Sequence, residues 1–286
     1  MSKTVLMFPG QGSQKTDMAR PFFDKIYNEA SAILGYSITD VIKDPDLLNT
    51  TLYTQPAVFV TSFAWYKRLE SKTGKADYLI GHSLGEWTAA LIGSVISFED
   101  ALKAVGERAR LMNEARSGGM AAVLGVTASQ IEKELTDYPD LNIANYNLPT
   151  QTVISGNKDQ IADFTSKTKA KVIPLKVSGA FHSPYMKQAS ESLSEFIKDI
   201  VFNDSKIPLI LNSTAEETSS GELIKKSLTD QLTRPVKFYQ SVEYAFSRGV
   251  GTFYEIGPSE VLTNMVKKIN GDAKAVSAQE IDRGSV

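Results

Sequence analysis

The chain has 286 residues, enough to bury the core of one large α/β domain or two modest ones. Its net charge of -2 lacks the basic excess typical of nucleic-acid-binding proteins, and the absence of cysteine excludes disulfides, thiolate catalysis and cysteine-bound metals. The N-terminal apolar run is too short for a signal peptide, and no run approaches the ~20 residues that span a bilayer. We therefore expect a cytoplasmic protein that binds neither nucleic acid nor membrane.

Strands and helices alternate from the start of the chain. Residues Thr4–Phe8 are typical of a buried strand, Pro56–Glu70 of a long helix, and Ala76–Gly81 of a second, short strand. A segment with helical spacing then begins at Ser83. This alternation predicts a parallel sheet flanked by helices.

The middle of the chain has a different order. A strand at Met120–Val126 is followed by a helix that opens on a threonine cap, then by two strands, a second helix and a strand at Lys171–Val177. The order β-α-β-β-α-β is the ferredoxin-like arrangement. We expect residues 119–186 to form a ferredoxin-like small subdomain, inserted into a large α/β subdomain of residues 1–118 and 187–286.

The rest of the chain returns to the first pattern. A helix from Pro184 precedes a strand at Ile207–Asn212, two further helices, a strand at Thr252–Gly257 and a last helix. No internal repeat or flexible linker separates these elements. We therefore expect the two subdomains to share one packed body.

The stretch Gly81-His82-Ser83-Leu84-Gly85 places one serine between two glycines, after a strand and before a helix. A nucleophile elbow needs this order, because the flanking glycines leave room for a strained turn. The alternative is an ordinary glycine-rich connection in which the serine caps the helix. We favour the nucleophile, and a helix beginning at Ser83 would let the Leu84 amide donate to a developing oxyanion.

The chain contains two histidines, His82 and His182. His82 is adjacent to Ser83, and neighbouring side chains diverge at such a turn, so we do not expect it to reach the serine oxygen. His182 follows a predicted strand, and the active sites of α/β proteins gather at the carboxyl ends of strands. If a histidine activates Ser83, it must be His182; the alternative is a histidine in a surface loop.

One arginine lies on the apolar side of a predicted helix. Helical spacing puts Arg108 on one stripe with Ala101, Val105 and Met112. A buried arginine needs a carboxylate partner. Two partners remain open: Glu86 in an internal ion pair, or a substrate carboxylate held in a bidentate fork.

Four features occur together and in order: FPGQGSQ, GHSLGE, Arg108 and GAFHS. With them the chain resembles the malonyl-CoA:acyl-carrier-protein transacylase family from Thr4 to about Ser277. The stretches LGYSI, YTQPA and GAFHS are most similar to free-standing acyltransferases of polyketide synthases, with the enzyme of fatty-acid synthesis as the close alternative. The resemblance implies that the large subdomain is α/β-hydrolase-like.

The resemblance also implies a role for each matched residue. Ser83 attacks the thioester of malonyl-CoA and becomes malonylated, and His182 takes the serine proton. The backbone amides of Gln11 and Leu84 form the oxyanion hole. The backbone carbonyl of Gln231 orients the histidine and replaces the acid of a serine–histidine–aspartate triad.

The resemblance implies that the protein recognises the acyl group by its charge. Arg108 would hold the malonyl carboxylate, and a neutral acetyl group would leave that charge without a partner. Phe181, next to His182, accompanies malonyl over methylmalonyl in related domains and would fill space at the α-carbon. Trp87 and Ala109 differ from the residues commonest in the family, which leaves the acyl specificity open.

The implied reaction moves a malonyl group from malonyl-CoA to the phosphopantetheine thiol of an acyl carrier protein by a ping-pong mechanism. No metal or organic cofactor is implied, and we expect a monomer. The alternatives are an acyl hydrolase that releases stalled acyl groups, an inactive scaffold that docks carrier proteins, and a generic α/β-hydrolase. The presence of Ser83, His182 and Arg108 together favours the transferase.

A small basic run on the small subdomain consists of Lys167, Lys169 and Lys171. It could help to dock an acidic carrier protein, and a solvated helix end is an equally good interpretation. Asn145 and Asn147 lie in a segment similar to the substrate-side loop of the family, and we assign them no role.

Overall fold

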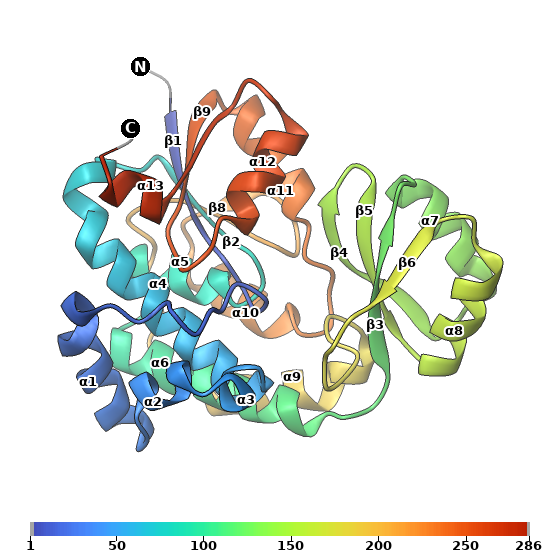
Figure 1. The fold of residues 1–286 in the computed structure, drawn as a ribbon, viewed down its shortest axis with the longest axis horizontal. Coiled ribbons are helices and arrows are strands. Elements are labelled where there is room, and N and C mark those ends of the chain that lie inside the picture. Colours follow the sequence, from blue (N-terminus) through green and yellow to red (C-terminus); the bar gives the residue numbers. More distant parts are fainter. Residues whose placement is uncertain (1–2, 285–286) are drawn as a thin grey trace.

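The computed structural model describes residues 3–284 and contains two sheets, one in each lobe of the molecule (Figure 1). The larger sheet has six strands in the order β10-β9-β1-β2-β7-β8, and all neighbours are parallel except the antiparallel pair β7 and β8. The strands are β1 (Lys3–Phe8), β2 (Tyr78–Gly81), β7 (Leu209–Ile210), β8 (Glu217–Thr218), β9 (Val250–Glu255) and β10 (Lys274–Ser277). The predicted parallel sheet is confirmed.

Helices bury both faces of this sheet. Alternate side chains of β1 point to opposite faces: Val5 and Met7 pack with α11 and α12, whereas Leu6 and Phe8 pack with α4, α5 and α6. The helices of this lobe are α1 (Asp24–Leu34), α2 (Ile38–Lys43), α3 (Pro45–Leu48), α4 (Thr51–Thr73), α5 (Gly85–Ile92), α6 (Phe98–Glu114), α9 (Lys187–Phe196), α10 (Gly221–Asp230), α11 (Phe238–Ser247), α12 (Val261–Ile269) and α13 (Ala278–Asp282), with short 3-10 turns at Pro21–Phe23 and Pro184–Met186.

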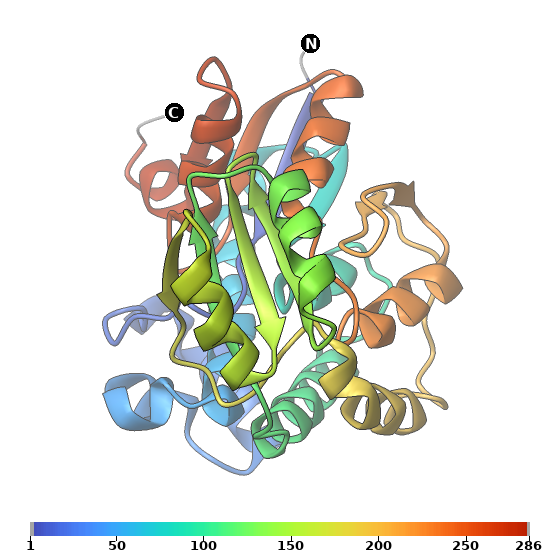
Figure 2. The ribbon, with the colours of Figure 1, turned by 90° about the vertical axis from the view of Figure 1, so that its right-hand side faces the viewer.

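The smaller lobe has the ferredoxin-like order that the sequence predicts. Its antiparallel sheet has the strand order β4-β5-β3-β6. The elements are β3 (Gly119–Leu124), α7 (Ala128–Glu134), a 3-10 turn (Leu135–Asp137), β4 (Leu141–Leu148), β5 (Gln151–Gly156), α8 (Lys158–Lys167) and β6 (Lys171–Pro174). Figure 2 shows α7 and α8 in front of the small sheet, which lies between these helices and the larger lobe.

Backbone hydrogen bonds join the two lobes. The Tyr146 N–H donates to the Val236 carbonyl at 2.9 Å, and the Val236 N–H donates to the Ala144 carbonyl at 2.8 Å. Strand β4 of the small sheet is thereby bonded to the segment just before α11. The division of the chain at 118/119 and 186/187 stays a prediction.

Several predicted boundaries are wrong. The helix expected at Pro56–Glu70 is α4, which runs from Thr51 to Thr73 and contains Pro56 within its second turn, where the missing N–H removes one backbone bond. The strand expected at Lys171–Val177 ends at Pro174, which has no N–H to continue the ladder. The strand expected at Ile207–Asn212 contains only β7.

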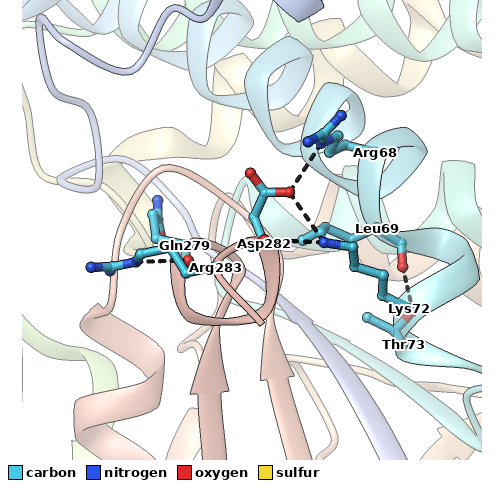
Figure 3. A network of polar contacts seen from close by, with 7 residues as sticks. All are labelled: Arg68, Leu69, Lys72, Thr73, Gln279, Asp282 and Arg283. Carbon is cyan, nitrogen blue, oxygen red and sulfur yellow. Dashed lines mark hydrogen bonds and ion pairs between the residues drawn. The ribbon is translucent and has the colours of Figure 1, made fainter. Parts of the chain in front are cut away.

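The end of the described chain is bonded to helix α4, in the first quarter of the sequence. Asp282 in α13 accepts hydrogen bonds from Arg68 at 3.0 Å and from Lys72 at 3.4 Å, both on α4 (Figure 3). Lys72 also donates to the Asp282 backbone carbonyl at 3.1 Å. Among residues 3–284, no helix is both long and apolar enough to cross a membrane.

Candidate active site

The turn between β2 and α5 has the geometry of a nucleophile elbow. Ser83 has a φ of 51°, which is strained for a residue with a side chain. A Cβ at Gly85 would lie 1.9 Å from the Phe8 carbonyl oxygen, and one at Gly81 would lie 1.9 Å from the Glu86 backbone nitrogen. Only glycine fits at both positions. The expectation that the helix begins at Ser83 is wrong: α5 begins at Gly85, because the serine occupies the left-handed turn.

Ser83 and His182 lie within hydrogen-bond distance across 99 residues of sequence. The serine Oγ is 2.9 Å from His182 Nε2, and His182 Nδ1 is 2.8 Å from the backbone carbonyl oxygen of Gln231. Because a carbonyl can only accept, Nδ1 carries the proton and Nε2 is free to accept the serine hydroxyl. His182 is 5% exposed and also has a positive φ, of 58°, so both members of the pair sit on strained backbone.

The surroundings of His182 keep its imidazole neutral. Burial lowers the histidine pKa to about 3, and the nearby Arg108 cation acts in the same direction, against the bond to Gln231. A neutral imidazole is the form that can take a proton from serine. His82 does not compete for this position, because its Nε2 lies 2.9 Å from Asn147 Oδ1.

Two backbone amides near the elbow have no acceptor among the described residues. Within residues 3–284, neither the Gln11 N–H nor the Leu84 N–H makes a hydrogen bond. The Gln11 side chain donates to Thr51 Oγ1 at 3.1 Å, which fixes the turn after β1. Leu84 directly precedes α5, where the helix dipole favours negative charge. These amides are available to an oxyanion, as the resemblance implies.

Arg108 reaches the serine from α6, and it is 1% exposed. Its Nη2 donates to Ser83 Oγ at 3.0 Å and to Gln231 Oε1 at 3.0 Å, and its Nη1 donates to Gln55 Oε1 at 2.5 Å. Its Nε has no partner among the described residues. Burial lowers the arginine pKa to about 10, so the guanidinium still carries its charge at neutral pH.

The two partners expected for Arg108 can now be compared. Within residues 3–284, no carboxylate forms an ion pair with Arg108, so the direct pair with Glu86 is wrong. The Gln231 side chain lies between them: its Nε2 bonds to Glu86 and its Oε1 to Arg108. The arginine fork thus meets neutral oxygens only and can receive a carboxylate from outside.

A cavity of about 810 Å³ opens beside the elbow, between the two lobes. Its lining includes Gln11, His82, Asn145, Asn147 and, from α12, Met265. Asn145 and Asn147 are both buried, and Asn147 holds the His82 ring. The cavity is large enough for an extended acyl-thioester arm.

Within the described chain, the remaining predicted residues make no hydrogen bond to Ser83. Phe181 is 5% exposed and belongs to the main hydrophobic cluster, and its effect on the acyl group stays a prediction. Trp87 and Ala109 are fully buried, so neither contacts solvent or lines the cavity. Lys167 pairs with Asp163 at 2.7 Å, as expected of a solvated helix end. No contact decides the role of Lys169.

Sequence reasoning missed two residues that hold the site together. Asn212 accepts the Ser83 N–H at 2.7 Å and donates to the Gly81 carbonyl at 2.6 Å, which links both sides of the elbow. Gln55 holds one end of Arg108. A polar side chain within the apolar run after Thr54 was a signal for Gln55, whereas nothing local singles out Asn212.

Acidic and imidazole groups do not gather elsewhere into a metal site. Within residues 3–284, no group of three or more histidine, aspartate or glutamate side chains is arranged to hold a metal ion.

Comparison with known proteins identifies the family. The acyl transferase domain model matches residues 5–281. The polyketide biosynthesis malonyl CoA-acyl carrier protein transacylase PksC of Bacillus subtilis is 40% identical over 283 residues, covering 94% of this chain and 98% of the relative. The malonyl-CoA:ACP transacylase of Synechocystis has a TM-score of 0.93 at 34% identity, covering 99% of this chain and 100% of that one.

A further solved structure contains two proteins. It is described as a type II polyketide synthase acyl-carrier protein in complex with its malonyl-transacylase, and it matches with a TM-score of 0.88 at 32% identity, covering 96% of this chain and 94% of that one. These names give no support to the hydrolase alternative. The structural matches confirm the expected α/β-hydrolase-like lobe with its inserted ferredoxin-like lobe. The chain belongs to the acyl transferase family, among the malonyl-CoA:acyl-carrier-protein transacylases.

Proposed function

We propose that this chain transfers a malonyl group from malonyl-CoA to the phosphopantetheine thiol of an acyl carrier protein, through a malonyl ester of Ser83. The observation that carries the proposal is the position of the serine oxygen. It lies 2.9 Å from a neutral imidazole and 3.0 Å from a buried guanidinium that has no carboxylate partner among residues 3–284. One group can activate the nucleophile, and the other can select an acyl chain that ends in an acid.

In the first half-reaction, Ser83 Oγ attacks the thioester carbonyl and His182 Nε2 takes the hydroxyl proton. The carbonyl oxygen becomes an oxyanion, which the unpaired N–H groups of Gln11 and Leu84 stabilise. The C–S bond then breaks, and the proton on Nε2 passes to the departing CoA thiolate. The hydrogen bond from His182 Nδ1–H to the Gln231 backbone carbonyl holds the ring in the tautomer that both proton transfers need.

In the second half-reaction, the carrier thiol enters the same cavity. His182 takes its proton, the thiolate attacks the malonyl-serine ester, and the proton returns to Ser83 Oγ as the ester bond breaks. The product is the malonyl thioester of the carrier protein. The same groups serve both steps because both steps exchange an ester and a pantetheine thioester at Ser83. CoA leaves before the carrier thiol enters, so the kinetics are expected to be ping-pong.

Arg108 supplies the selectivity for malonyl in this proposal. Its Nη2 lies close enough to Ser83 Oγ for the far carboxylate of a malonyl ester to reach the guanidinium. Phe181 is proposed to disfavour a branched α-carbon. The carrier protein belongs to polyketide or fatty-acid synthesis, and the Bacillus subtilis relative is named for the former. The absence of a cofactor, the monomeric state and the cytoplasmic location stay predictions.

Intact-protein mass spectrometry after brief exposure to malonyl-CoA tests the proposal. The wild type is expected to gain one malonyl group and to lose it when a carrier protein bearing its phosphopantetheine arm is added. Ser83→Ala is expected to gain none, and His182→Ala to be slower by about a hundredfold or more. A wild type that stays unlabelled by malonyl-CoA, yet is labelled by acetyl-CoA, would overturn the proposal.

A further inference from the structure

Glu86 is a buried acid that the proposed mechanism does not use. It follows the elbow on α5 and is 0% exposed. Its Oε1 accepts from the Asn212 backbone N–H at 3.3 Å and from the Ser227 hydroxyl at 3.1 Å, and its Oε2 accepts from the Gln231 side-chain amide. Both oxygens therefore act as acceptors, and one of the donors belongs to the backbone and cannot turn away.

The Gln231 side chain has two unlike ends, and Glu86 decides which way they point. A carboxylate oxygen needs a donor, so the Gln231 Nε2 must face Glu86, where it also donates to the Ser83 carbonyl at 3.1 Å. The amide oxygen is then left facing Arg108 Nη2 at 3.0 Å. With the amide reversed, its NH₂ group would face the guanidinium, and donor would meet donor.

The spacing of the two charges explains why an amide stands between them. A direct ion pair would occupy the fork of Arg108 and exclude a substrate carboxylate. With Gln231 interposed, Glu86 supplies a buried negative charge near Arg108, while both ends of the fork donate to neutral oxygens that a substrate carboxylate could replace. The backbone carbonyl of Gln231 also orients His182, so one residue links the acid to both working side chains.

The geometry points to Glu86 as a positioning residue for acyl selectivity: through the Gln231 side chain it holds Arg108 ready for the malonyl carboxylate without pairing with it. This inference rests on the proposed function. The arrangement requires a side chain at position 86 whose two polar atoms both accept hydrogen bonds. A glutamine at position 86 must either turn its NH₂ toward the Asn212 N–H or turn it toward Gln231 and reverse that amide.

The test compares acylation of Ser83 by malonyl-CoA and by acetyl-CoA, above the Glu86 pKa of about 7, where the acid is ionised. In Glu86→Gln, the ratio of kcat/KM for malonyl-CoA to that for acetyl-CoA is expected to fall at least tenfold, mainly through the KM for malonyl-CoA. Glu255→Gln is the matched control. Glu255 is an equally buried acid that bonds to Ser259 and Thr263 instead, so its replacement should leave the ratio unchanged.

A swapped double variant, E86Q with Q231E, decides the case even if Glu86→Gln fails to fold. It keeps the net charge, the carboxylate–amide bond and the backbone carbonyl at position 231, but places the carboxylate directly on Arg108. The malonyl preference is expected to stay low. A swapped variant with the wild-type preference would overturn the inference, as would a folded Glu86→Gln that keeps it. A wild type that is never malonylated would instead overturn the proposed function.

Discussion

At the scale of single residues, the proposed function assigns activation of the nucleophile and selection of the acyl chain to two different groups. His182 Nε2 and Arg108 Nη2 approach Ser83 Oγ independently, at 2.9 and 3.0 Å. The serine can donate to the first and accept from the second. A change in Arg108 should therefore alter which acyl group is accepted more than whether the serine reacts.

Arg108→Gln is expected to lower kcat/KM for acylation by malonyl-CoA by about a hundredfold or more, because a charge-assisted, buried contact to the malonyl carboxylate is lost. Acylation by acetyl-CoA should change by less than about tenfold, since acetyl makes no such contact. The two rates would be followed by release of free CoA, with thermal unfolding as the control for folding. Equal losses with both substrates would mean that Arg108 acts on the serine rather than on the malonyl carboxylate.

At the scale of elements, the sequence predicts what local spacing encodes. The strand β1, the elbow turn before α5 and the β-α-β-β-α-β order of the small lobe follow from apolar runs and glycine positions. The contact of Arg108 with Ser83 follows only in part, because helical spacing shows that Arg108 is buried but not what it meets. Asn212 and Gln231 lie 129 and 148 residues from Ser83, and no local pattern connects residues that far apart.

The last predicted helix corresponds to α12, and the sequence does not predict α13, which is held to α4 by exposed ion pairs. Asp282→Ala removes the contacts of the carboxylate with Arg68 and Lys72, which are 46% and 43% exposed. Exposed pairs contribute about 0.2–1 kcal/mol each, so the free energy of unfolding in urea should fall by about 1 kcal/mol. Glu70→Ala, which removes a similarly exposed pair with Lys67 within α4, should cost less. Acylation should be unaffected, and a loss of activity would contradict a purely local role for α13.

At the scale of the whole molecule, the site lowers the stability of the fold. Two strained φ angles, a buried guanidinium and a buried carboxyl are grouped around one serine. The hydrogen-bond partners of the buried Arg108 and Glu86 all come from the large lobe, so the packing of that lobe must offset the cost. The part of this cost that comes from the buried carboxyl of Glu86 can be measured from the pH dependence of the free energy of unfolding.

Burial raises the pKa of Glu86 from 4.5 to about 7, partly offset by its hydrogen bonds and Arg108. Between these values the folded protein holds a proton that the unfolded chain has released, so stability falls as pH rises through this window. Glu86→Gln removes this titration. Its free energy of unfolding, relative to that of the wild type, should therefore rise by up to about 3 kcal/mol as the pH goes from 4.5 to about 7. Urea unfolding at a series of pH values measures this difference.

The pKa of Glu280 is shifted in the opposite direction from that of Glu86, so its effect on the pH dependence of stability has the opposite sign. The bonds from Ser277 at the start of α13 lower the Glu280 pKa below its usual 4.5. The folded protein then releases this proton at lower pH than the unfolded chain, so the stabilisation is present above 4.5 and is lost as pH falls through the lowered pKa. Glu280→Gln should therefore lose stability relative to the wild type as pH rises, where Glu86→Gln gains it. Parallel curves for the two variants would mean that Glu86 does not titrate as a buried acid.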